Sequence, residues 1–157
     1  MAIEIINGLY IGNKKSAFDT NFLISRKIRL IINTTNNVEF FNCCEKMGIK
    51  CIRASIQDNF QESERSKHNR NYFYQLRGLC EIIDNKLENN NNILVHCRHG
   101  KYQSTCLIIA YIMYKTKMKL DDVYELISLK YPMVKMKNHL FLEALQLFED
   151  ENRNLDK

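Results

Sequence analysis

A cysteine stands at the junction between an apolar, strand-like run and a helix-like run. Residues 93–96 read Ile-Leu-Val-His, residues 97–102 are polar and include Gly100, and residues 103–113 contain neither proline nor glycine. This order predicts a strand, a tight loop and a helix. The N–H groups and partial positive charge at a helix N-terminus favour a bound anion and stabilise a thiolate. Cys97 is therefore a candidate nucleophile beside a candidate anion site.

Residues 96–104, His-Cys-Arg-His-Gly-Lys-Tyr-Gln-Ser, resemble the signature of the protein tyrosine phosphatase superfamily. That signature runs His-Cys, five residues, Arg, then Ser or Thr, and only Gln103 departs from it. The resemblance implies that Cys97 attacks phosphorus, that Ser104 donates to the thiolate and helps it leave, and that His96 sets the loop by hydrogen bonding. The phosphate-binding residues that it implies are Cys97, Arg98, His99, Gly100, Lys101, Tyr102 and Gln103.

Gln103 decides how much activity the resemblance implies. The arginine of the family makes two charge-assisted hydrogen bonds to the phosphate oxygens and offsets charge that would repel the thiolate. A glutamine amide is neutral, and loss of a cationic group in phosphoryl transfer costs roughly 10³–10⁵ in rate. We therefore expect a catalytically inactive or severely impaired phosphatase, a pseudophosphatase, that binds a phosphorylated protein or peptide through the Cys97–Ser104 loop.

Two alternatives remain open from the sequence. The first is a weakly active protein tyrosine or serine/threonine phosphatase that forms a Cys97 thiophosphate intermediate, with Lys101 or Arg98 supplying the missing charge. The second is a pure protein-interaction domain without an anion site. The basic side chains of Arg98, His99 and Lys101 fit an anion site and fit a solvent-facing loop equally well. Tyr102 is bulky for its position, so it either crowds the pocket or stacks on a ligand.

The similarity covers nearly the whole chain and is greatest to the small dual-specificity phosphatases. Residues 6–12, Ile-Asn-Gly-Leu-Tyr-Ile-Gly, resemble the opening strand of that family. Residues 56–59, Ile-Gln-Asp-Asn, resemble the loop of the general acid, which would be Asp58. Taken alone, Asp58 is an ordinary turn residue. Asn138, at the start of the closing helix, would brace the phosphate loop.

Strand and helix patterns alternate along the chain. Asn7-Gly8 predicts a hairpin turn between two short strands, and Gly48 predicts the end of a short helix. The resulting fold class is α/β, with a central, mostly parallel, twisted sheet of about five strands flanked by helices. The expected strands are 3–6, 9–11, 28–32, 49–54 and a strand from 93, and the expected helices are 17–25, 40–47, 73–88, a helix after Gly100, 121–131 and 138–151, with residues 58–71 as a surface loop.

The whole chain fits one domain, residues 1–157. Its net charge of +5 comes from scattered residues, which suits an anionic ligand and argues against nucleic acid. No apolar run approaches the about 18 residues of a membrane span, and no leader is recognisable, so we expect a cytoplasmic protein. The abundance of Asn, Lys and Ile suggests an A/T-rich genome such as that of a large DNA virus. Monomer and homodimer are both compatible with the sequence.

The six cysteines show no regular spacing, and several lie in apolar runs, where a reduced thiol behaves as a small hydrophobic group. Disulfides are not expected in a reducing compartment. His96, Cys97 and His99 form a possible zinc set, but no second cluster of cysteine and histidine lies at ligand spacing. We therefore expect neither a metal nor a cofactor.

Overall fold

The computed structural model describes residues 2–41, 44–56, 65–100, 102–132, 134 and 139–154, without the side chains of residues 65–70, 72, 139 and 140. Three residues of the predicted site, Asp58, Lys101 and Asn138, lie outside the described residues.

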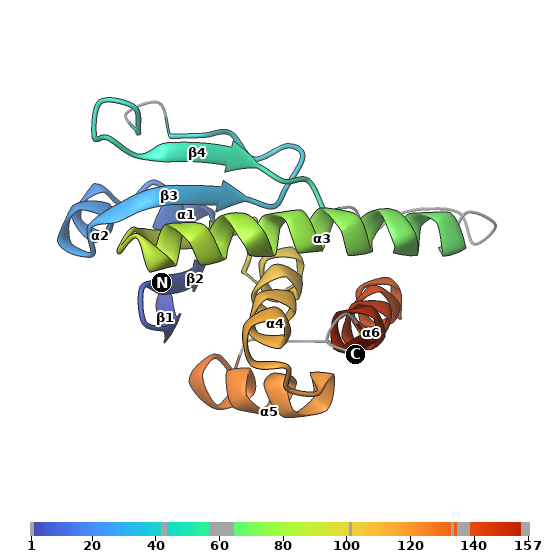
Figure 1. The fold of residues 1–157 in the computed structure, drawn as a ribbon. Coiled ribbons are helices and arrows are strands. Elements are labelled where there is room, and N and C mark those ends of the chain that lie inside the picture. Colours follow the sequence, from blue (N-terminus) through green and yellow to red (C-terminus); the bar gives the residue numbers. More distant parts are fainter. Residues whose placement is uncertain are drawn as a thin grey trace.

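A five-stranded sheet forms the centre of the fold (Figure 1). Its strands stand in the order β1-β2-β5-β3-β4, with β1 and β2 antiparallel and the other neighbours parallel. The predicted mostly parallel α/β sheet is confirmed, and so is the hairpin, in which Gly8 has a φ of +85°. The strands are β1 (Ile3–Ile6), β2 (Leu9–Gly12), β3 (Ile28–Asn33), β4 (Lys50–Arg53) and β5 (Asn92–His96).

Helices cover both faces of the sheet, and each face has its own apolar cluster. In β5, Ile93 and Val95 belong to the larger cluster, whereas Leu94 belongs to the smaller one, as the alternation of a strand requires. The smaller cluster is completed by residues of α1 and α2, and the larger by residues of the other helices. The helices are α1 (Lys14–Ala17), α2 (Thr20–Ser25), α3 (Arg65–Glu88), α4 (Gln103–Thr116), α5 (Leu120–Lys130) and α6 (His139–Asn154).

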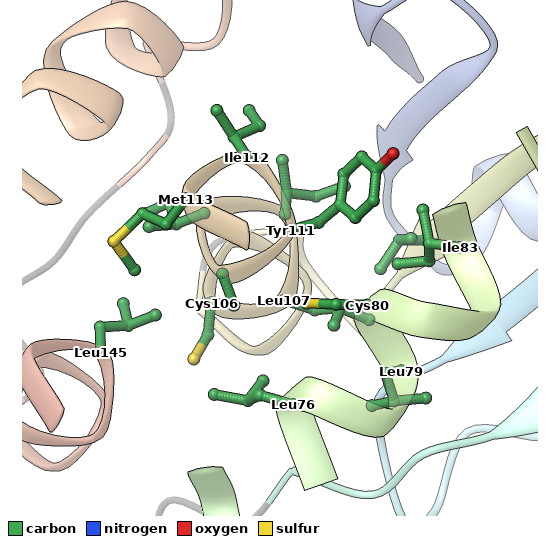
Figure 2. Packing of buried hydrophobic residues seen from close by; sticks show 14 of the residues in the cluster. Leu76, Leu79, Cys80, Ile83, Cys106, Leu107, Tyr111, Ile112, Met113 and Leu145 are labelled. Carbon is green, nitrogen blue, oxygen red and sulfur yellow. The ribbon is translucent and has the colours of Figure 1, made fainter. Parts of the chain in front are cut away.

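Helix α4 is the centre of the larger cluster. All residues from Ser104 to Met113 are buried, so this helix has neighbours on every side rather than one apolar face. Figure 2 shows the labelled side chains of α3, among them Leu76 and Ile83, directed at α4, with Leu145 of α6 on another side. This packing fixes the helix N-terminus relative to the sheet, because a close-packed core leaves little room for α4 to shift.

Three predicted elements are wrong in detail. The helix expected over 17–25 is two helices, because the Asp19 carboxylate accepts a hydrogen bond from the Phe22 N–H and starts a new helix there. The helix expected over 40–47 is absent from its described part, where Met47 N–H donates to the Cys44 carbonyl in a succession of turns. Helix α3 begins at Arg65, within the expected loop 58–71, since a polar helix end lacks the apolar periodicity that reveals a helix.

No helix in the described part of the chain is long and apolar enough to cross a membrane.

Candidate active site

The Cys97 loop, defined here as residues 97–102, joins the carboxyl end of β5 to the N-terminus of α4. Because β5 lies between β2 and β3, the loop occupies the middle of the sheet edge where α/β proteins bind ligands. The loop is fastened at its start by Thr34, whose N–H and hydroxyl both donate to the His96 carbonyl, at 3.0 and 2.9 Å. The Lys14 N–H donates to the Arg98 carbonyl at 3.2 Å and holds the loop to α1.

The thiol of Cys97 is the chemical centre of the loop. Its side chain is 3% exposed, its Sγ lies 3.1 Å from the Ser104 hydroxyl oxygen, and it accepts the Gly100 N–H at 3.1 Å. Hydrogen bonds to sulfur favour the thiolate, which is the nucleophilic form. Ser104, in the first turn of α4, therefore faces the sulfur. The N-terminus of that helix has no side-chain cap at Tyr102.

Gly100 adopts a conformation that other residues rarely take. Its φ is +71°, and a Cβ at this position would stand 3.0 Å from the Gly12 carbonyl oxygen and 2.5 Å from the Tyr131 hydroxyl oxygen. A larger residue would therefore be strained and would collide with both neighbours. The loop depends on glycine here because this backbone conformation directs the Gly100 N–H at the sulfur.

His96 is a neutral, buried residue at the start of the loop. It is 1% exposed, and burial lowers its pKa from 6.5 to about 4. Its Nδ1 lies 3.4 Å from the Cys97 carbonyl oxygen, which is long for a hydrogen bond. The backbone carbonyl of His96, through Thr34, holds the loop more firmly than its ring does.

Gln103 is tied to the protein backbone. Its Nε2 donates to the Ile56 carbonyl at 3.1 Å, and the Ile56 N–H donates in turn to the Thr34 carbonyl at 3.0 Å. The residue at the arginine position of the family signature thus links the start of α4 to the chain segment that precedes Asp58. It brings no positive charge to the loop.

The remaining described side chains of the loop lie at its surface. Arg98 and His99 are exposed, and Tyr102 is 38% exposed. An anion that approaches the loop would meet the Arg98 charge, although solvent and salt screen an exposed charge. The structure brings together Cys97, Gly100 and Ser104.

Sequence reasoning missed two parts of the structure around this loop. The first is the set of side-chain bonds in the loop after β3, residues 33–38, which the polar run 33–37 predicts only as a turn. There the Asn33 side chain accepts from Thr35 and donates to the Val38 carbonyl at 2.7 Å. The second is Tyr131, which the helix pattern predicts only as the end of a helix. The Asn33 bonds are local, within five residues of the chain. No local pattern marks the Tyr131 contact, because it depends on how separate segments come together in the fold.

No group of three or more His, Cys, Asp or Glu side chains that could hold a metal ion occurs within the described residues. The possible zinc ligands His96, Cys97 and His99 therefore do not form such a group within this part of the chain.

A cysteine loop between the central strand and the central helix of this sheet is the arrangement of the cysteine-based phosphatase fold. The family model of the dual specificity phosphatase catalytic domain matches residues 9–151 of the chain. The chain belongs to the dual specificity phosphatase family.

Relatives of the chain include human dual specificity protein phosphatase 9, which is 30% identical over 82% of the chain. The chain spans 31% of the length of that protein. Protein 123R of Invertebrate iridescent virus 6 is 29% identical over 93% of the chain and 90% of its own length. The solved structure of a variant of human DUSP28 has a TM-score of 0.83 at 17% identity and covers 98% of the chain and 97% of its own, which shows the shared fold.

Proposed function

We propose that this chain is a pseudophosphatase, which binds phosphorylated protein partners at the Cys97 loop and hydrolyses them poorly or not at all. The observation that carries the proposal is the hydrogen bond of 3.1 Å from Gln103 Nε2 to the Ile56 carbonyl. The side chain at the arginine position is uncharged and is used to join two protein segments.

Loss of hydrolysis follows from electrostatics. The attacking group is a thiolate and the phosphate ester is a dianion, so the two repel each other in a buried site unless a cation lies between them. Cationic groups that stabilise phosphoryl transfer contribute about 10³–10⁵ in rate. The Gln103 amide contributes no charge, and the Arg98 side chain is exposed at the loop surface rather than buried beside Cys97.

Retention of binding is supported by the parts of the loop that do not involve residue 103. The loop leads into the N-terminus of a helix of 14 residues, whose first turn has no side-chain cap at Tyr102. Backbone N–H groups in this arrangement bind phosphate without a side-chain charge. The family suggests that the anion bound here is a phosphate group on a partner protein.

The activity test compares the native chain with Gln103→Arg on p-nitrophenyl phosphate. We expect negligible release by the native chain and an increase of about 10³ or more in Gln103→Arg, because the guanidinium restores the cation beside the thiolate. The increase must disappear in Gln103→Arg with Cys97→Ser. Brisk hydrolysis by the native chain that depends on Cys97 would contradict the proposal.

Gln75→Arg is the matched control for this test. Gln75 also donates through its amide to a backbone carbonyl, that of Ser55 at 3.0 Å, one residue from the acceptor of Gln103. We expect no gain in hydrolysis from Gln75→Arg. A gain equal to that of Gln103→Arg would show that added charge, rather than the position of residue 103, is responsible.

Binding is measured by calorimetry with a phosphotyrosine peptide, a phosphothreonine peptide and the same peptides without phosphate. The native chain should bind at least one of the phosphorylated peptides, and Gly100→Ala should abolish that binding, because it displaces the N–H from the loop. Absence of binding by the native chain would instead support a pure interaction domain.

A further inference from the structure

Tyr131 reaches the Cys97 loop from a distant part of the chain. It follows α5 directly, and its N–H donates to the Ile127 carbonyl at 2.7 Å, while its carbonyl accepts the Val134 N–H at 3.1 Å. Helix α5 is itself held at the hairpin by Lys130, whose Nζ donates to the Ile5 carbonyl at 2.7 Å. The position of the Tyr131 ring is therefore set on both sides by the backbone and by the anchored helix.

The hydroxyl of Tyr131 lies against Gly100. A Cβ on Gly100 would stand 2.5 Å from this oxygen, so the space that a side chain would need is already occupied. Tyr131 is only 3% exposed. Burial raises the pKa of its hydroxyl, and the nearby Cys97 raises it further.

We propose that the Tyr131 hydroxyl is a positioning group for the Cys97 loop, which holds Gly100 in its left-handed conformation with the N–H directed at the sulfur. The Gly12 carbonyl oxygen lies near the same point, 3.0 Å from the position of an added Cβ on Gly100. Two oxygens, one from β2 and one from the end of α5, thus occupy the space beside the Gly100 Cα that a side chain would need. The inference deepens the proposed anion-binding function and concerns the same loop.

This role has a chemical consequence for Cys97. If Gly100 is free to rotate, its N–H leaves the sulfur and the thiolate loses one of the two hydrogen bonds described for it. The rate at which Cys97 reacts with an alkylating agent should then fall, because the thiolate is the reacting form and has lost a donor that stabilises it. A tyrosine that only fills space in the core would leave this rate unchanged when its hydroxyl alone is removed.

The experiment measures alkylation of Cys97 by iodoacetamide across a range of pH, with the site of labelling resolved by peptide mass spectrometry because the chain has six cysteines. Tyr131→Phe should slow the labelling of Cys97 at neutral pH by about threefold to tenfold, as expected for a weakened hydrogen bond to a charged group. Its pH profile should move to higher pH. An unchanged or faster rate would overturn the proposal.

Tyr111→Phe is the matched control. Tyr111 is also a buried tyrosine, but its hydroxyl donates to Asp84 at 2.8 Å, in the interface of α3 and α4 rather than at the loop. We expect Tyr111→Phe to leave the Cys97 labelling rate within twofold of the native value. An equal loss of rate in both variants would overturn the proposal, since it would reflect general loosening of the core.

A double-mutant cycle with Gly100→Ala tests the contact itself. Alone, Gly100→Ala places a methyl group against the Tyr131 hydroxyl, so the stability of this variant should improve when Tyr131→Phe is added. Strictly additive changes would overturn the proposed contact. Because neither readout uses phosphate, failure of phosphopeptide binding would reject the proposed function while leaving this result intact.

Discussion

The loops that follow the two neighbouring strands β3 and β5 are built in opposite ways. In the β3 loop, residues 33–38, polar side chains form hydrogen bonds with the loop itself. Asn33 bonds Thr35 and Val38, and the Arg53 guanidinium donates to the carbonyls of both at 2.8 and 2.7 Å. In the Cys97 loop, the N–H of Gly100 and the hydroxyl of Ser104 meet at a sulfur atom.

The difference separates a loop that bonds its own backbone from the loop that we propose binds an anion. Hydrogen bonds that close a backbone turn satisfy groups that must be paired in any folded state. A thiol needs no such pairing, because it behaves as a small hydrophobic group when it is buried. Donors directed at Cys97 therefore indicate chemistry, and the two loops should respond differently to the same kind of substitution.

The largest effect on stability is expected where the two loops meet, at His96, whose carbonyl is bound by Thr34. The pKa of His96 is about 4 in the folded chain and 6.5 without the protein around it. As the pH falls, the unfolded chain therefore binds the proton first, and the free energy of unfolding should decrease by about 3 kcal/mol from about pH 7 to about pH 4.

This dependence is measured by urea unfolding at several pH values in the native chain and in His96→Gln, which does not titrate. The difference between the two curves isolates the contribution of His96 from that of the carboxylates. Parallel curves would mean that His96 is accessible to protons in the folded state.

Asn33→Ala tests the structural loop and should lower the free energy of unfolding by about 2 kcal/mol, because the buried Thr35 N–H and hydroxyl lose the side-chain oxygen that accepts from them. Asn92→Ala is the control, since that side chain makes its bond of 2.7 Å to the Arg26 carbonyl in an exposed setting. The rate of Cys97 alkylation should stay within about twofold in both variants. A large decrease in that rate for Asn33→Ala would contradict the distinction drawn between the β3 loop and the Cys97 loop.

The smallest change in stability, about 1 kcal/mol or less, is expected for Ser104→Ala and Thr105→Val, which are adjacent and fully buried in α4. Their effects on Cys97 should nonetheless differ. The Ser104 hydroxyl lies 3.1 Å from the sulfur, whereas the Thr105 hydroxyl has no hydrogen-bond partner among the residues that the structure describes. Ser104→Ala should slow alkylation about tenfold, and Thr105→Val should leave it unchanged and slightly stabilise the chain. Equal rates in the two variants would contradict the role of Ser104.

Much of the fold was predictable because its central elements have strong local signals. The apolar run of β5, the glycine at 100 and the uninterrupted helix after it define strand, loop and helix without tertiary information. Asn7-Gly8 likewise defines the hairpin. Errors occurred where a single side chain overrides the periodicity, as Asp19 does between α1 and α2.

The site was predictable in its composition but not in its contacts. The positions of Cys97, Gly100 and Ser104 follow from a short motif whose spacing fixes their neighbourhood. The bond from Gln103 to Ile56 joins residues 47 apart, and Tyr131 lies in a different helix region from the loop that it contacts. Such contacts depend on how β4, α4 and α5 pack around the sheet, and no local pattern encodes them.

The strand order also has a consequence for synthesis of the chain. β2 and β3 do not pair with each other, and both pair with β5, which is the last strand to be made. Until residues 92–96 leave the ribosome, a nascent chain therefore lacks the strand that joins β1 and β2 to β3 and β4. The segment that joins them into one sheet is the segment that ends at the cysteine, so the reactive thiol acquires its surroundings in the same step that completes the sheet.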